Sequence, residues 1–258
     1  MTLSILIPAL ESRKQMLAEL MARLEPQAKA FGRQVEILVE QDDGQVPSGE
    51  KRNRLIRRSR GDYFAQLDDD DMVQKNYVAS LIEGCKTGAD VVTFDLERLG
   101  KDRPREIHAF SIHYRDRQRL PWGGVGMQAN HLCAWRRDVG TAVSFPPILG
   151  YNDDVFWYGP LMASGLVKTE HRVEDVLYTY HYAPTVTRNQ LVHQVRLTAQ
   201  WSAGGVPCWF IAGRVYVAVM GQDHYRGLDA IQARDGAGTV YTFCRHAMPK
   251  PFFVARMK

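Results

Sequence analysis

The first hundred residues alternate short apolar runs with segments whose apolar positions recur at helical spacing. The runs at residues 3–7, 35–39, 63–67 and 89–94 predict short, buried strands. Helical spacing of apolar residues predicts helices over 16–24 and 78–85, and a basic segment at 51–60 predicts another. Ser12 and Pro26 are expected to begin and end the first helix, and Gly61 to end the basic one. This order predicts an α/β fold, with a mainly parallel sheet flanked by helices.

After residue 100 the pattern is weaker. A glycine-rich loop at 122–126, a short strand at 130–135, a helix at 153–163 and a strand at 173–182 are predicted, and no motif follows residue 188. We therefore predict a main domain over residues 1–187 and a C-terminal extension over 188–258. The extension is expected either to pack on the core or to help bind a substrate.

Composition narrows the class of protein. The chain has 258 residues, of which 45% are hydrophobic, enough for one sizeable core, and its net charge of +4 is only mildly basic. The four cysteines form no C-x-x-C pair, so neither a zinc site nor a disulfide framework is expected. No signal peptide or membrane span is predicted, because the most apolar late stretch, 206–220, is short and contains Arg214. We expect a cytoplasmic protein without integral membrane association, and the oligomeric state stays open.

An acidic cluster follows the predicted strand 63–67. Ligands of α/β sheets bind beyond the carboxyl ends of the strands, which is where this cluster falls. Four adjacent carboxylates repel one another unless a positive charge lies among them, and Mg²⁺ or Mn²⁺ prefers such oxygen ligands. The alternative is a solvated acidic turn. The cluster consists of Asp68, Asp69, Asp70 and Asp71.

A basic helix precedes that strand. Lys51 and Arg52 fall on its first turn, where helix N-termini attract anions, so we interpret them as phosphate-binding residues. The later arginines of the helix, Arg57, Arg58 and Arg60, are expected to form an exposed face.

Two weaker signals come later in the chain. Asp153 and Asp154 open a predicted helix, where a carboxylate can serve as a general base or simply as an N-terminal cap. His181 lies among Tyr178, Tyr180 and Tyr182, and is either a packing residue or a metal ligand.

In their order, these motifs resemble the GT-A-fold glycosyltransferases of family 2. The resemblance covers residues 2–185. In chain order, the family's motifs are a strand ending in Pro, an Asp-Asp-Gly element, an Arg-Asn pair, a Gly-Asp-Tyr element and an Asp-x-Asp motif. A glycine loop, an arginine-containing strand, an acid pair and a late histidine then follow. The matching residues are Pro8, Asp42–Asp43–Gly44, Arg52–Asn53, Gly61–Asp62–Tyr63, Asp68–Asp69–Asp70, Gly123–Gly124, Arg136–Arg137, Asp153–Asp154 and His181.

The resemblance implies a GT-A domain that transfers a sugar, with inversion, from a nucleotide-sugar donor such as a UDP-sugar. It implies that Asp70, with Asp68 and His181, holds Mn²⁺ or Mg²⁺, and that Asp154, paired with Asp153, is the catalytic base. Two departures are present: Ala9-Leu10-Glu11 stands where the family has Tyr-Asn, and Asp153 replaces the usual Glu. The donor-binding residues it implies are Pro8, Asp42, Asp43, Lys51, Arg52, Asp68, Asp69, Gly123 and Gly124.

The acceptor stays open at this point. A glycan hydroxyl is the family's commonest acceptor, whereas the mild basicity and late aromatic residues such as Trp201 and Trp209 also allow a hydroxymethylated base in phage-type DNA. A sugar nucleotidyltransferase is one alternative function, although residues 8–11 lack its glycine-rich phosphate loop. A non-catalytic nucleic-acid-binding protein that uses residues 51–60 is the other.

Overall fold

The computed structural model describes residues 2–100, 103–114, 117–146 and 153–182. It also describes the strand backbones at 198–201, 208–211, 214–219, 230–234, 240–244 and 255–256. In the described part of the chain, no helix is long and apolar enough to cross a membrane.

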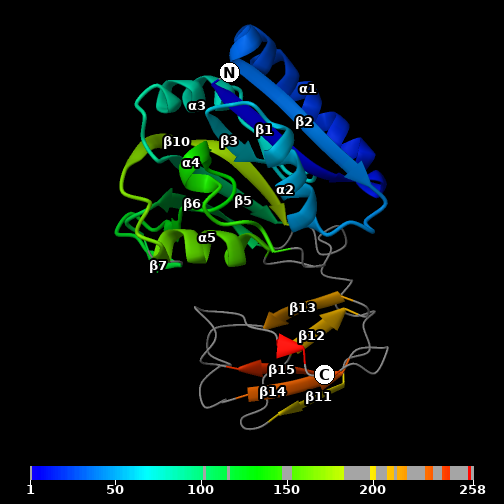
Figure 1. Cartoon of the computed structure of the whole chain (residues 1–258). Coiled ribbons are helices and arrows are strands. Elements are labelled where there is room, and N and C mark those ends of the chain that lie inside the picture. Colours follow the sequence, from blue (N-terminus) through cyan, green and yellow to red (C-terminus); the bar gives the residue numbers. More distant parts are fainter. Residues whose placement is uncertain are drawn as a thin grey trace.

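One large mixed sheet organises residues 3–182 (Figure 1). Its strands follow the order β2-β1-β3-β9-β5-β6-β8-β7, and β10 pairs with β5 and with β4. The first three strands run parallel, as predicted, and β9 is antiparallel to both of its neighbours. The strands are β1 Leu3–Leu10, β2 Val35–Asp42, β3 Tyr63–Gln66, β4 Met72–Val73, β5 Val91–Gly100, β6 Arg103–Ser111, β7 Gln118–Arg119, β8 Val125–Gln128, β9 Ala134–Arg136 and β10 Glu170–Tyr182.

Helices cover this sheet, and their packing follows the apolar pattern of the sequence. Helix α1 (Lys14–Ala30) buries Leu20, Leu24 and Ala28 and packs against α3 (Tyr77–Cys85). Helix α2 (Ser48–Arg58) packs on β1 and against α5 (Asp153–Ala163), and a short helix, α4 (Arg137–Gly140), follows β9. The α/β architecture predicted from the sequence is therefore confirmed.

Three boundary predictions were wrong. Helix α1 continues past Pro26, because the buried Leu24 and Ala28 keep the helix on the sheet. Ser12 does not cap it; Ser12 lies in a 3₁₀ turn at Glu11–Arg13.

Helix α2 ends at Arg58, with Ser59 as the C-cap, rather than at Gly61. The Arg137 side chain donates to the carbonyl groups of Ile56 and Gly61 and to Ser59 Oγ, so it satisfies the end of the helix from another element.

Aromatic rings anchor the start of α5 to the sheet. Trp157 is fully buried, stacks on Phe145 at 4.5 Å between ring centroids, and meets Trp135 edge-on at 5.4 Å. Its indole N–H donates to the carbonyl oxygen of Val143 at 2.9 Å. Because Asp153 and Asp154 lie one turn earlier, this packing fixes the acid pair relative to the sheet.

The backbone strands after residue 188 form two separate small sheets. One has the order β11-β14-β15-β16, and the other is the β12–β13 hairpin; every pair is antiparallel. The strands are β11 Thr198–Trp201, β12 Cys208–Ile211, β13 Arg214–Val219, β14 Ala230–Arg234, β15 Val240–Cys244 and β16 Ala255–Arg256. The side chains of Trp201 and Trp209 lie outside the described residues.

Candidate active site

The acidic cluster follows the end of β3, beside the end of β1. The N–H of Leu67 donates to the carbonyl oxygen of Leu6 at 2.9 Å, so the chain leaves the sheet at Asp68. Asp69 and Asp71 are each 2% exposed, whereas Asp68 and Asp70 are partly exposed. The four aspartates therefore alternate between buried positions and positions that reach the surface.

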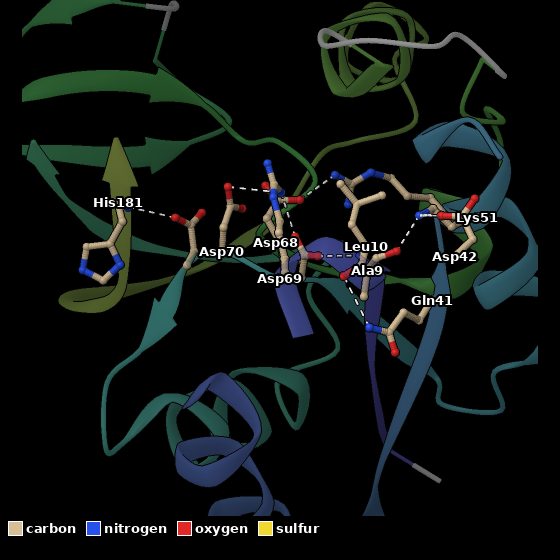
Figure 2. Close-up of polar contacts among 12 residues, drawn as sticks. Ala9, Leu10, Gln41, Asp42, Lys51, Asp68, Asp69, Asp70 and His181 are labelled. Atoms are coloured by element: carbon tan, nitrogen blue, oxygen red, sulfur yellow. Dashed lines mark hydrogen bonds and ion pairs between the residues drawn. The ribbon is translucent and has the colours of Figure 1, made fainter. Parts of the chain in front are cut away.

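Each buried aspartate accepts hydrogen bonds from fixed donors. Asp69 accepts from the N–H of Leu10 at 2.7 Å and from Arg13 at 2.8 Å (Figure 2). Asp71 accepts from the hydroxyl of Tyr178 and from the N–H of His181, both at 2.8 Å. These two carboxylates tie the cluster to β1 and β10.

Arginines partner the two exposed aspartates. Asp68 accepts from Arg52 Nη2 at 2.7 Å, and Asp70 lies 3.1 Å from Arg13 Nη1. Although burial opposes ionisation, the Arg52 guanidinium holds the pKa of Asp68 well below its usual value. Burial and the charges of Asp68 and Asp69 raise the pKa of Asp70 to about 7, despite the opposing effect of Arg13. Asp70 is thus the carboxylate of this pair that a further cation would stabilise most.

Lys51 and Arg52 are both buried, at 3% and 4% exposure. Lys51 Nζ donates to the carbonyl oxygen of Ala9 and to Asp42 Oδ1, each at 2.6 Å, and so joins the ends of β1 and β2 (Figure 2). Arg52 donates to Asp68 and, through Nε, to Asp153 Oδ2 at 3.1 Å. Both cations therefore already hold acidic groups at this edge of the sheet.

The acid pair at the start of α5 divides into two environments. Asp153 is 5% exposed and bound to Arg52; burial raises its pKa. Asp154 has a quarter of its side chain exposed, and its Oδ2 lies 3.3 Å from His131 Nδ1. Although burial opposes ionisation, the contact with His131 lowers the pKa of Asp154. Asp154 is thus the more accessible member of the pair.

His131 completes the cluster and was not predicted as a site residue. Its Nε2 lies 3.4 Å from Asp68 Oδ2, so the imidazole stands between Asp68 and Asp154. Burial and Arg52 act to lower the pKa of His131, but the two carboxylates outweigh them and raise it to about 9. The sequence did not reveal this contact, because His131 is a single histidine in a segment predicted as a strand and belongs to no motif.

Two comparisons with known proteins bear on this arrangement. Residues 48–140, which run from α2 to α4 and include Arg52 and Asp68–Asp71, match the family model described as glycosyl transferase family 2. This stretch of the chain is therefore similar to the family 2 glycosyltransferases. No curated protein matches it at the sequence level.

Solved structures share the GT-A fold of this chain at low sequence identity. The crystal structure of S. aureus TarS matches 71% of the chain at 13% identity, with a TM-score of 0.50. The crystal structure of S. aureus TarS 1-349 in complex with UDP-GlcNAc matches to the same extent, also with a TM-score of 0.50. The chain spans 37% and 59% of the length of these two structures.

The other predicted donor-binding residues lie at several places. Pro8 lies in β1, and Asp42 accepts from the N–H of Val46 as well as from Lys51. Asp43 is exposed and bonds to Gln45. Gly123 and Gly124 lie in the turn between β7 and β8, and the hydrogen bonds of that turn run between residues 120 and 124. Their contact with a donor stays a prediction.

The predicted metal ligands are Asp68, Asp70 and His181. Within the described residues, no three acidic, histidine or cysteine side chains form a metal-binding group. The imidazole of His181 points away from Asp68 and Asp70, and its backbone N–H, not its ring, contacts the cluster (Figure 2). Asp68 and Asp70 fit a divalent cation as a carboxylate pair, because both carry hard oxygen donors and Asp70 lacks full charge compensation.

Proposed function

We propose that the chain transfers a sugar from a nucleotide-sugar donor to an acceptor hydroxyl, with inversion at the anomeric carbon and with Asp154 as the general base. One observation carries the proposal: Asp154 is an accessible carboxylate whose pKa the contact with His131 lowers, and the same imidazole contacts Asp68. A catalytic base has to be near the donor yet open to the acceptor. The exposure of Asp154 and its link through His131 to Asp68, a predicted donor-binding residue, support this role.

In this reaction the acceptor oxygen attacks the anomeric carbon from the face opposite the diphosphate. A new C–O bond forms as the bond to the diphosphate oxygen breaks, and its electron pair leaves with the nucleoside diphosphate. Asp154 takes the proton of the attacking hydroxyl. Asp153 stays bound to Arg52 and does not take part in the proton transfer.

Asp68 and Asp70 are the residues that would hold Mn²⁺ or Mg²⁺ against the donor diphosphate. When bound, such an ion supplies positive charge that stabilises the leaving group. Lys51 and Arg52 act in this scheme by fixing Asp42 and Asp68, so their contribution to donor binding is mainly through these carboxylates.

We propose a UDP-sugar as the donor and a glycan hydroxyl as the acceptor. The UDP-GlcNAc complex of the TarS structure, which shares the fold, supports this choice of donor. A hydroxymethylated DNA base is the rival acceptor, but the basic stretch offers it little free charge, since its exposed arginines pair with glutamates. These pairs are Arg54 and Arg57 with Glu50, Arg54 and Arg58 with Glu40, and Arg60 with Glu36.

Substitution of the acid pair tests the role of Asp154. Asp154→Asn should lower the rate of UDP release from the UDP-sugar, with water as the acceptor, by about 10²- to 10⁴-fold, because the proton acceptor is lost. Donor affinity, measured by calorimetry, should stay within about threefold of the wild type, since the change acts on the transition state.

Asp153→Asn is the matched control. It leaves the base intact but removes the carboxylate that pairs with the buried Arg52, so it should mainly lower the free energy of unfolding, by about 3–5 kcal/mol. An Asp154→Asn protein that turns over at the wild-type rate would contradict the assignment.

A further inference from the structure

The main chain holds His131 firmly between β8 and β9. Its carbonyl oxygen accepts from the N–H of Gln66 at 3.2 Å, which ties it to the end of β3. The neighbouring Asn130 is fixed as well: its side chain accepts from the N–H of Leu132 at 3.0 Å, and its carbonyl oxygen accepts from Trp135 Nε1 at 2.8 Å. With 6% of its surface exposed, the His131 imidazole has little freedom to reorient.

The two ring nitrogens face carboxylates that come from different elements. Nε2 lies 3.4 Å from Asp68 Oδ2, just beyond β3, and Nδ1 lies 3.3 Å from Asp154 Oδ2, at the start of α5. Carboxylate oxygens accept hydrogen bonds, so a ring N–H on either side of the imidazole faces an acceptor. The buried imidazole thus spans the gap between the two elements.

The buried cation Arg52 acts elsewhere in the site. Arg52 donates to Asp68 and to Asp153, and its guanidinium lies 5.7 Å from the centre of the Phe145 ring. It therefore holds the non-reacting member of the acid pair, whereas His131 touches the reacting one.

We infer that His131 is a positioning residue of the transfer reaction, which holds the carboxylate of Asp154 at a fixed place relative to Asp68. This inference rests on the proposed role of Asp154 as the base. It goes beyond that role by coupling the base to the donor-binding carboxylate through one side chain. Without His131, two carboxylates would face each other across a buried gap, and Asp154 would turn away from Asp68.

Two substitutions separate the two contacts of the ring. The amide nitrogen of His131→Asn lies near the place of Nδ1 and can still donate to Asp154, whereas that of His131→Gln lies near the place of Nε2 and can donate to Asp68. His131→Gln should lower kcat for UDP release from the UDP-sugar by about 10- to 100-fold, as is typical when a supporting side chain is lost. Its KM for the donor should change by less than about threefold.

His131→Asn should keep most of the wild-type kcat. A kcat higher in His131→Asn than in His131→Gln distinguishes a positioning role from a general effect on folding. His108→Gln is the matched control, because His108 also contacts a carboxylate, that of Glu106 at 2.7 Å, but on β6. Its kcat should equal that of the wild type. Unchanged kcat in His131→Gln, or equal losses in His131→Asn and His131→Gln, would overturn the inference.

Crystal structures of the wild type and of His131→Gln test this inference separately from the proposed function. If the wild type releases no UDP from any donor, the proposed function fails, and the position of the Asp154 carboxylate then decides the role of His131. Displacement of this carboxylate in His131→Gln supports a positioning role, and an unmoved carboxylate contradicts it.

Discussion

Asp90 is a buried carboxylate that main-chain groups hold in place away from the acidic cluster. Its Oδ2 accepts from the N–H groups of Lys168 and Thr169, both at 2.8 Å, and its Oδ1 lies 2.9 Å from Arg136 Nη1. Burial opposes ionisation, but these donors outweigh it and lower the pKa of Asp90. The residue thereby joins the loop before β10 to the start of β5.

We expect Asp90→Asn to lower the free energy of unfolding at pH 7 by about 1–3 kcal/mol, because the amide cannot accept from all three donors. A carboxyl group whose pKa is lowered by folding stabilises the protein above its unfolded pKa, near 3.9, and this contribution disappears as the pH falls further. Urea unfolding of the wild type and of Asp90→Asn at pH 7 and near pH 3 measures the difference in their free energies of unfolding. The difference should shrink at the lower pH, and a difference independent of pH would contradict the account.

Single residues also show what the sequence could predict. Asp68–Asp71 and Asp153–Asp154 are local runs of carboxylates at predicted element ends, so the sequence alone suggested them. His131 and Arg13 carry no such pattern, because their partners lie far away in the chain: His131 is 63 residues from Asp68, and Arg13 is 56 from Asp69. Such pairings arise only when the sheet brings its strand ends together.

Among the elements, helix α2 lies very close to the segment after α4. A Cβ atom on Gly49 would meet the carbonyl oxygen of Pro146 at 2.0 Å and Phe145 Cβ at 3.3 Å. The side chain of Asn53 completes the contact, since it donates to the carbonyl of Phe145 at 2.7 Å and accepts from its N–H at 3.0 Å. This approach positions the helix that carries Lys51 and Arg52.

Gly49→Ala should therefore push α2 away and lower the free energy of unfolding by about 1–3 kcal/mol, with a fall in activity. Gly159→Ala in α5 is the control: no atom lies within 4 Å of its added Cβ, so the better helix propensity of Ala should raise stability by about 0.5–1 kcal/mol. Denaturant unfolding of both variants measures the effects. A Gly49→Ala protein as stable as Gly159→Ala would show that the contact is not tight.

The sequence placed the first strands and helices well but not their ends. Apolar runs identified β1, β2 and β3 because their residues are buried in the sheet. Pro26 and Gly61 misled the prediction of helix ends, because tertiary contacts decided them: the buried Leu24 and Ala28 in α1, and Arg137 at the end of α2. The antiparallel strand β9 is only three residues long, too short for its pattern to reveal its direction.

For the whole molecule, we propose that residues 1–187 form a unit that folds and binds the donor without residues 188–258. Every strand of the large sheet and every residue of the candidate site lies between residues 3 and 182. A protein ending at residue 187 should show a cooperative thermal transition and bind the donor nucleotide as the full chain does. Loss of cooperative unfolding, followed by circular dichroism, would show that the extension is part of the core.

The most direct test of the account is a thermal-shift measurement with UDP-, GDP-, TDP- and CDP-sugars, each with and without Mn²⁺. At a donor concentration about a hundredfold above its Kd, the stabilisation is about 2.7 kcal/mol, which corresponds to a rise in Tm of roughly 5–10 °C. The account predicts such a rise for the UDP-sugar, dependent on Mn²⁺ and lost in Asp70→Asn. No shift with any nucleotide sugar, or a shift that neither Mn²⁺ nor Asp70→Asn alters, would contradict it.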